Sequence, residues 1–313
     1  MKPTLSRMKG ARAIGWVAVT LVTLVSGFWA FWGVNEAFHE GWSKPHLWMR
    51  LLQVLAYLSP AAVLCALTVL GIRWPRVGAT LFDLAAVVIA GLMMWDGAYF
   101  GAQITILLTV VPVVVGFLFF VGRPTPKRTA YAISIGVPLA IVIGFGAEPI
   151  VRVNSRLDDG DRGARLVEGN GVKLLWAPAG PGWTRKGLVS WDEAVRRARY
   201  LTADGTALAD TPQDVWRLPG RAEIVQSLTR GGHNAGGTWD AERKQANYDR
   251  RPDKESPLWD QYAPLIYLWT AEEQSSELAW IVVYHGGVYS KPKDVGSPSF
   301  GFRAVREPPT KSD

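Results

Sequence analysis

Polar and aromatic side chains that could bind a ligand are concentrated in residues 231–262. Aromatic faces combined with a few fixed polar groups are the usual composition of a binding site. The segment shows no apolar periodicity, and a loop of this length in a compact domain is usually functional or flexible. We therefore predict a ligand-binding loop, with the following residues as its binding groups: Asn234, Trp239, Asp240, Tyr248, Asp253, Glu255 and Trp259.

The same segment has a second interpretation, in which it only covers a sheet. Residues 252–259 would then fold over the strands, with Leu258 and Trp259 inserted into the core. Loops of this kind often serve packing alone. The sequence leaves both interpretations open.

Acid–base groups are present, but their order matches no catalytic arrangement. A nucleophile, a base and a group that orients the base cannot be recognised among the candidates. We therefore expect a non-catalytic domain without a cofactor, and an enzyme is the alternative. The candidate groups are His233, His285, Asp240, Asp253 and Glu255.

A metal site is considered at His39, Glu40 and His46, which lie close together in the sequence. Their spacing matches no helical His-Glu-x-x-His site, and a Gly and a Pro interrupt the stretch. Packing at a membrane interface is the favoured role. The chain has one cysteine, Cys65, so it cannot form a disulfide or a zinc knuckle within one chain.

Long apolar runs occupy the first half of the chain. A membrane span needs roughly 20 apolar residues to cross a hydrocarbon core of about 30 Å. Five segments meet this requirement, and we expect a membrane α-helical region that contacts the lipid bilayer. The predicted spans are residues 13–34, 50–72, 77–95, 104–122 and 130–148.

The loops between these segments predict the orientation. The N-terminus and residues 73–76 and 123–128 are rich in Lys and Arg, whereas residues 35–48 and 96–103 hold a single Lys. Basic loops stay in the cytoplasm. The N-terminus is therefore expected to be cytoplasmic and residue 149 onward extracytoplasmic. The same loops explain much of the net charge of +7, so nucleic acid is not expected as a partner.

Asp83 is the ionisable residue well inside a predicted span. An intramembrane acid is a functional hypothesis by default. Asp83 lies only about one and a half to two turns from the cytoplasmic end of its span, so hydration at the interface explains it better. No second charge accompanies it to form a relay, which disfavours a transporter.

The second half predicts an α+β domain. Residues 171–176 favour a strand, and Ser190 with Glu193 forms a capping box that opens a helix through Leu201. Trp216 and Leu218 alternate with polar neighbours as in a half-buried strand. A helix follows with Gly220 as N-cap and Glu223 at the capping-box position. We expect Gly231–Gly232 to end that helix, and late strands at residues 265–270, 279–284 and 300–306.

Four of these motifs occur in an order that resembles the bacterial DUF1566 family, also called the Lcl C-terminal domain. The resemblance covers about residues 170–307. It implies a C-type-lectin-like fold, related to the formylglycine-generating enzymes but without their copper-binding cysteines. It does not imply catalysis. Its structural positions are Trp191, Glu193, Trp216, Arg217, Leu218, Pro219, Glu223, Trp269, Arg303 and Arg306.

The chain departs from that family at two places. Gly220 stands where the family usually has Thr, and the frequent cysteine pair is absent, with Ala304 at one of its positions. Arg303 and Arg306 lie an odd number of residues apart, so on one strand they would face opposite sides. We expect each to pair with an acid.

Together these observations predict four parts: a five-span transmembrane domain (1–150), a linker (151–169), a lectin-like domain (170–307) and a tail (308–313). The expected function is a membrane-anchored recognition or structural module with a glycan, peptide or protein ligand. Its expected location is the bacterial inner membrane, with the C-terminal domain in the periplasm or outside the cell.

Overall fold

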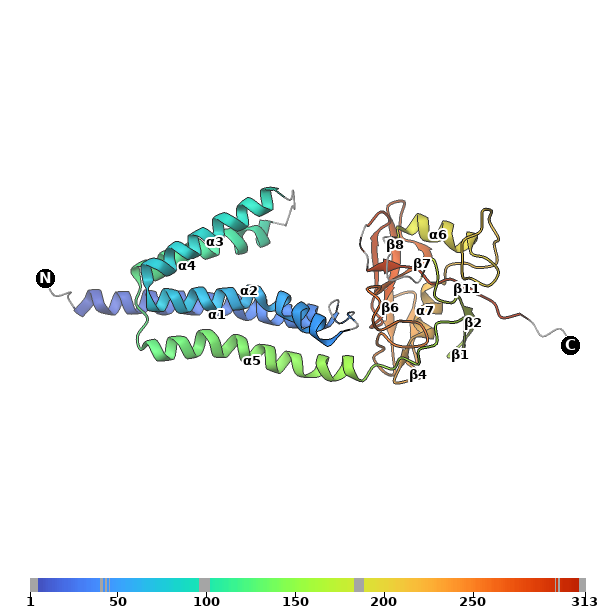
Figure 1. Ribbon diagram of the computed structural model, residues 1–313, viewed down its shortest axis with the longest axis horizontal. Coiled ribbons are helices and arrows are strands. Elements are labelled where there is room, and N and C mark those ends of the chain that lie inside the picture. Colours follow the sequence, from blue (N-terminus) through green and yellow to red (C-terminus); the bar gives the residue numbers. More distant parts are fainter. Residues whose placement is uncertain are drawn as a thin grey trace. The chain divides into compact units, whose positions relative to one another are not determined.

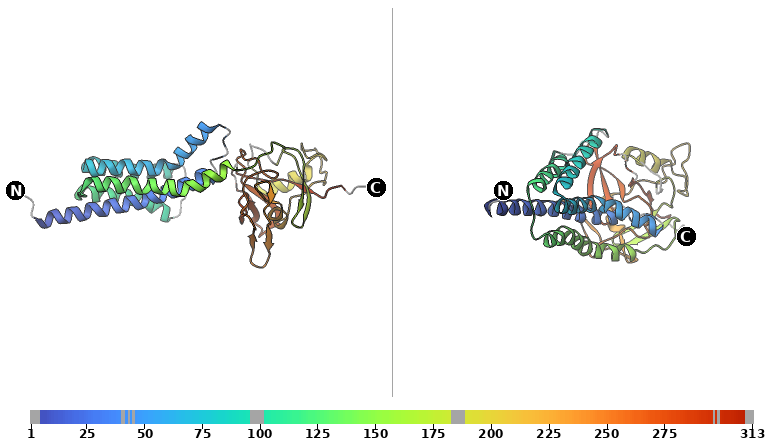
Figure 2. Two further views of the ribbon diagram at one scale, coloured as in Figure 1. Left: turned by 90° about the horizontal axis from the view of Figure 1, so that it is seen from below. Right: turned by 60° about the vertical axis from the view of Figure 1, so that its left-hand side comes forward.

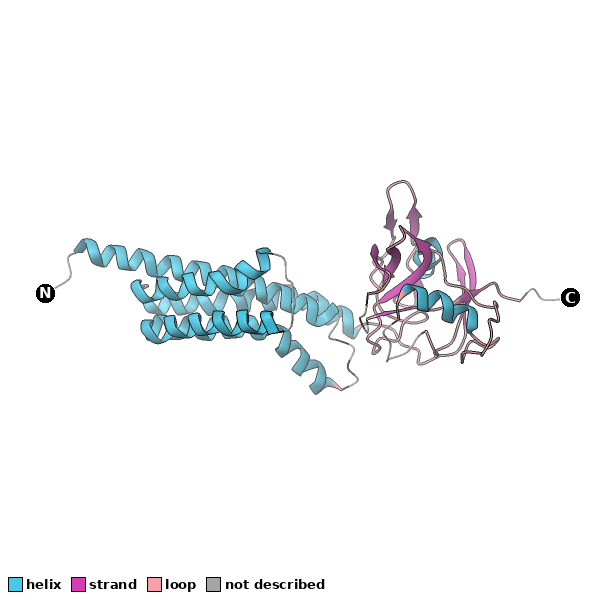
Figure 3. Ribbon diagram, turned by 90° about the horizontal axis from the view of Figure 1, so that it is seen from above, coloured by secondary structure: helices cyan, strands magenta, loops and turns pink. Residues whose placement is uncertain are grey.

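The computed structural model describes residues 5–39, 42, 44, 46–95, 102–182, 189–295, 297 and 299–309. The chain divides into two compact units, which we describe separately. The N-terminal unit contains Met1–Gly41 and Leu51–Ile150, and the C-terminal unit contains Trp42–Arg50 and Val151–Asp313. The described strands all belong to the C-terminal unit (Figure 3).

Five helices build the N-terminal unit (Figure 1). Four of them are long and apolar enough to cross a membrane, which confirms the expected membrane region; α4 is shorter in its described part, Thr105–Val121. A fifth span therefore stays a prediction. The helices are α1 (Leu5–His39), α2 (Leu47–Arg73), α3 (Pro75–Trp95), α4 (Ala102–Val121) and α5 (Lys127–Asn154).

The helices of this unit pack tightly near the turn between α2 and α3. A Cβ atom on Gly78 would lie 2.2 Å from the Cα of Gly71, so only glycine permits this approach. Phe82 and Phe119 stack there with ring centroids 5.9 Å apart. With distance from this turn, the pair of α3 and α4 diverges from α1 and α2 (Figure 1). Helix α5 runs alongside α1 and α2 (Figures 1 and 2).

The C-terminal unit contains a three-stranded sheet, a four-stranded sheet and two small hairpins. The three-stranded sheet has the order β1-β2-β11, and the four-stranded sheet has the order β10-β7-β8-β9, in which β10 is parallel to β7. Hairpins β3–β4 and β5–β6 lie between helix α7 and strand β7 in the sequence. The elements are β1 (Arg165–Gly169), β2 (Val172–Trp176), α6 (Trp191–Tyr200), α7 (Arg221–Ser227), β3 (Thr229–Arg230), β4 (His233–Asn234), β5 (Thr238–Asp240), β6 (Gln245–Asn247), β7 (Tyr267–Glu273), β8 (Leu278–Val283), β9 (Val288–Pro292), β10 (Phe300–Gly301) and β11 (Val305–Arg306).

Both predicted helix starts are confirmed. The Ser190 side chain accepts a hydrogen bond from the backbone N–H of Glu193 and begins α6. Gly220 is the N-cap of α7, and the carboxylate of Glu223 accepts from its N–H at 2.7 Å. Because glycine lacks a capping hydroxyl, the second helix keeps only the reciprocal half of the capping box.

Three predicted boundaries are wrong. Gly231 and Gly232 do not end α7, which stops at Ser227; both have positive φ and form the turn of hairpin β3–β4, where two such angles are required. Residues 300–306 do not form one strand, because the chain passes from one sheet to the other after Gly301. The expected linker contains strand β1, which pairs with β2.

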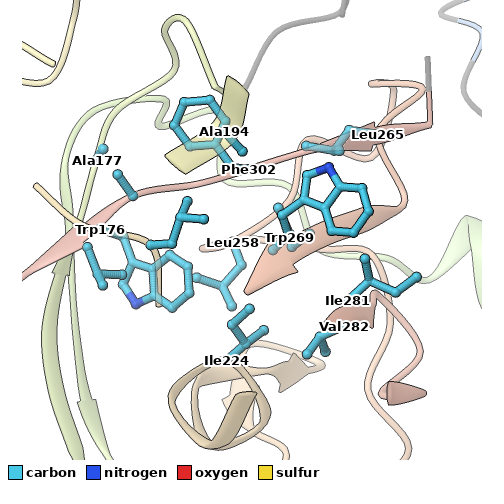
Figure 4. Packing of buried hydrophobic residues seen from close by; sticks show 14 of the residues in the cluster. Trp176, Ala177, Ala194, Ile224, Leu258, Leu265, Trp269, Ile281, Val282 and Phe302 are labelled. Carbon is cyan, nitrogen blue, oxygen red and sulfur yellow. The ribbon is translucent and has the colours of Figure 1, made fainter. Parts of the chain in front are cut away.

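One hydrophobic core lies between the helices and sheets of the C-terminal unit (Figure 4). Trp176 from β2 and Trp269 from β7 are fully buried in it. The indole of Trp269 donates to the carbonyl of Val189, and that of Trp216 donates to the carbonyl of Thr202. Carbonyl oxygens are common partners of buried indoles, and these two bonds also fix the segments before and after α6.

Candidate functional site

Two acids of the predicted binding loop are buried in an ion cluster. Asp253 is 1% exposed and contacts Arg152, Arg156 and Arg230 at 3.0–3.3 Å. Glu255 is fully buried and accepts from the backbone N–H groups of Leu157 and Gly231. We call Arg152, Arg156, Arg230, Asp253 and Glu255 the arginine–acid cluster.

The pKa of Asp253, the acid at the centre of this cluster, reflects the positive charges around it. Burial by itself would raise the pKa of Asp253, but the guanidinium groups of Arg156 and Arg152 outweigh it and lower the pKa. The Asp253 carboxylate is thus ionised and fully engaged by protein groups. It holds residues 152–157 against the loop at 253–255 and has no surface to offer a ligand.

Lys254 lies between the two acids and points into the interior. Burial, followed by the positive charge of Arg156, lowers its pKa to about 7. Its ammonium group donates to the carbonyl of Ala263. This residue too belongs to the scaffold.

Two aromatic rings of the predicted loop, those of Trp259 and Tyr248, also face inward. Trp259 is 1% exposed and packs edge-on against Tyr284, and Leu258 beside it is equally buried. Tyr248 donates its hydroxyl to the carbonyl of Gly286, and burial raises its pKa. These placements favour the interpretation in which residues 252–259 cover the sheet.

The remaining predicted residues are engaged by other protein groups, two of them in turns. Asn234 bonds the backbone of Gln226 and Gly236, while Asp240 accepts from two backbone N–H groups within the β5–β6 turn, those of residues 242 and 243. Trp239 lies against the guanidinium of Arg221, 5.0 Å from the ring centroid. The structure therefore does not bring the seven predicted residues together at one surface.

The predicted metal ligands are only partly described. His39 lies 3.7 Å from Glu36 one turn earlier in α1, and His46 is exposed just before α2. Glu40 lies outside the described residues. Among the residues that the structure describes, no group of three His, Cys, Asp or Glu side chains could hold a metal ion.

A surface groove lies where α6, the start of α7 and strand β7 meet. Its volume is about 450 Å³. We call it the α6–α7 groove. It is lined by Trp191, Val195, Ala198, Arg199, Arg217, Leu218, Gly220, Glu223, Ala271 and Glu272.

Backbone and indole hydrogen bonds hold the three elements around the groove. The indole of Trp191 on α6 donates to the carbonyl of Thr270 on β7, at 2.8 Å. The N–H of Ala271 donates to the carbonyl of Pro219 just before α7, at 2.9 Å. Pairing of β7 with β8 is irregular between Trp269 and Glu273, so the chain there is free to bond Pro219 instead. The groove is therefore a preformed feature.

The floor of the groove is apolar and its walls carry both charges. Ala198 and Leu218 are buried beneath it. On one wall Arg217 forms a two-bond ion pair with Glu223 at 2.7 Å. Burial raises the pKa of Glu223, and the bonds from Arg217 and the Gly220 N–H more than reverse this, so the pKa is lowered.

The second acid of the groove binds the start of α7. Both carboxylate oxygens of Glu272 accept from the backbone N–H of Arg221 at 3.0 Å. On the α6 side, Arg199 pairs with Asp214 at 2.7 Å, and both side chains are more than half exposed. Cationic and anionic groups therefore both lie at the rim of an apolar floor.

Four residues that the sequence identified as structural motif positions line this groove: Trp191, Arg217, Leu218 and Glu223. Sequence reasoning missed their binding potential, because it placed the ligand in the long loop. The available signal was the charged pair of Arg217 and Glu223 on either side of the proline corner. Apart from the N-cap Gly220, the other lining residues come from α6 and β7, and nothing in their local sequence marks them.

The two arginines near the end of the chain hold loops in place. Arg303 is 1% exposed and donates to the carbonyls of Ala177 and Pro257. Arg306 lies over the ring of Trp216, 4.5 Å from its centroid, and donates to the carbonyl of Ala203. These contacts differ from the acid pairs that we expected. The two residues are not on one strand, so the argument from strand alternation does not apply.

Comparison with known proteins gives no identification: no protein-family model, curated protein or solved structure matches the chain.

Proposed function

We propose that the protein is a membrane-anchored recognition module that binds an extended peptide segment in the α6–α7 groove. The observation that carries this proposal is the preformed groove itself, with an apolar floor and side chains of both charges on its walls. A few fixed polar groups around apolar surface are typical of binding sites. Non-catalytic binding fits the engagement of the groove acids, since Glu223 and Glu272 already accept two or more hydrogen bonds.

The chemistry of the groove favours a peptide over a glycan. Sugars are commonly bound against an open aromatic face, but Trp191 is 7% exposed and the ammonium of Lys293 lies 4.5 Å from its ring centroid. A peptide with apolar side chains and both charges would match the floor, the arginines and the glutamates at once.

The proposal includes the membrane arrangement. Five spans with a cytoplasmic N-terminus would place the C-terminal unit outside the cytoplasm of a bacterial cell. Its support is the distribution of Lys and Arg among the loops. The C-type-lectin-like fold and the relation to the DUF1566 family belong to the same proposal, and their support is the four ordered motifs.

The test is selection of linear peptides from a displayed random library on the full chain in lipid nanodiscs, with a soluble glycan array in parallel. Val195→Trp fills the groove from α6, and Val215→Trp is the matched control because Val215 is exposed and does not line the groove. We expect selected peptides to bind the wild type and Val215→Trp equally, and Val195→Trp at least tenfold more weakly. Selected peptides that ignore Val195→Trp would refute the site. Glycan binding that Val195→Trp abolishes would refute the ligand class.

A further inference from the structure

A second cavity, in the N-terminal unit, lies between helices α1, α2, α3 and α4. Its volume is about 350 Å³. The buried cluster around Phe82 and Val115 forms one part of its wall, and Pro60 and Pro112 lie inside α2 and α4 beside it. The pair of α3 and α4 diverges from α1 and α2 in this unit (Figure 1), and the cavity is bounded by both pairs.

The lining of this cavity offers a ligand almost no polar group. Most lining side chains are aliphatic, such as Leu64, Leu108 and Val111. The hydroxyl of Ser59, which also lines the cavity, donates to the carbonyl of Ala56 at 2.7 Å. Cavities with apolar walls stay dry and bind apolar molecules, because a water inside would lack two to four polar partners. Water is therefore excluded as the filling.

The surroundings of the unit indicate what fills the cavity instead. Apolar side chains cover the outside of α2, α3 and α4, as the exposed residues Leu55, Val87 and Val110 show. Such helices are solvated by lipid, and acyl chains are then the apolar molecules present at the highest concentration. A flexible acyl chain can adapt its shape to an apolar cavity of about 350 Å³.

We propose that this cavity binds the acyl chain of a membrane phospholipid. The site is independent of the α6–α7 groove, since its walls belong wholly to the N-terminal unit. It gives the helical unit a ligand of its own in addition to its anchoring role. The bound chain completes the packing between the two diverging helix pairs, so the lipid is a structural ligand.

Neighbouring valines on α4 offer a matched pair of variants. Val111 lines the cavity, whereas Val110 is 50% exposed and does not. Val111→Trp should fill the cavity, and Val110→Trp adds the same ring on the outer face. Ala85→Phe fills the cavity from α3 and serves as a second variant if Val111→Trp does not fold.

The experiment is native mass spectrometry of the full chain after detergent extraction from vesicles of phosphatidylethanolamine and phosphatidylglycerol doped with polyprenyl phosphate. We expect one phospholipid retained per chain in the wild type and in Val110→Trp, and at least tenfold lower occupancy in the folded cavity-filling variant. A photoreactive diazirine on the acyl chain should label Leu108 in the wild type and not in that variant. Equal retention by all variants, no retained lipid, or selective retention of polyprenyl phosphate would each overturn the proposal.

Discussion

Substituting Asn for Asp253 should destabilise the C-terminal unit strongly. The substitution keeps the shape of the side chain but removes the negative charge that Arg152, Arg156 and Arg230 share. Arg152 and Arg230 are 16% and 26% exposed at their side chains and can regain water. The Arg156 side chain is only 2% exposed and cannot.

The expected loss of stability comes from the charge of Arg156, which stays buried after its acidic partner is removed. Removing one partner of a buried ion pair costs about 3–5 kcal/mol, because the other charge stays desolvated. For a folding unit of this size, about 2–4 °C of melting temperature corresponds to each kcal/mol, so the midpoint should fall by about 6–20 °C. Since the pKa of Asp253 is lowered, its contribution is complete at neutral pH and disappears as the pH falls through the lowered pKa.

The assay is thermal unfolding of the full chain in detergent, followed by near-ultraviolet circular dichroism at pH 7 and at acid pH. Glu168→Gln is the control, because Glu168 forms an exposed ion pair with Lys173, and exposed pairs contribute little. In a double variant, Arg156→Met should recover part of the loss from Asp253→Asn. An Asp253→Asn midpoint indistinguishable from the control would refute the reasoning.

Three further predictions address pH, capping and topology. Lys254→Met should raise the melting temperature most at pH 6–7 and progressively less towards pH 10. The reason is that the folded-state pKa of Lys254 is lowered to about 7, so the wild type becomes more stable as the pH rises above that value. A gain in melting temperature that is independent of pH would contradict this. Glu223→Ala should cost about 1–2 kcal/mol in urea unfolding, because it removes the acceptor for the N-cap N–H, and an unchanged midpoint would exclude the cap. In a Cys65→Ala background, an impermeant maleimide added to intact spheroplasts should label Ser299→Cys and leave Thr125→Cys unlabelled. The reverse labelling pattern would refute the proposed orientation.

Local signals made part of the fold predictable. The length of apolar runs identified the four helices that meet the requirements for a span, because hydrocarbon thickness fixes that length. Ser190 with Glu193 and Gly220 with Glu223 marked the two helix starts, since a cap involves residues only three positions apart. Strands β2, β7 and β8 followed from their runs of apolar residues.

Long-range relations could not be predicted in the same way. Asp253 contacts Arg152 and Arg156, which lie about a hundred residues away in the sequence. The composition of the loop around Asp253 therefore suggested an open ligand site. The α6–α7 groove joins three elements that are held by long-range bonds, from Trp191 to Thr270 and from Ala271 to Pro219. Residues 300–306 resembled one strand because nothing local shows that the chain changes sheets there.

The last strands have a consequence for the order of events during synthesis. Strands β10 and β11 follow the other described strands in the sequence, and each completes a different sheet, one against β7 and the other against β2. While the ribosome still holds residues 300–306, neither sheet can close. We therefore expect the C-terminal unit to finish folding only after these residues have emerged, and nascent chains stalled with residues 300–306 inside the ribosome should remain sensitive to protease where chains that expose them are resistant.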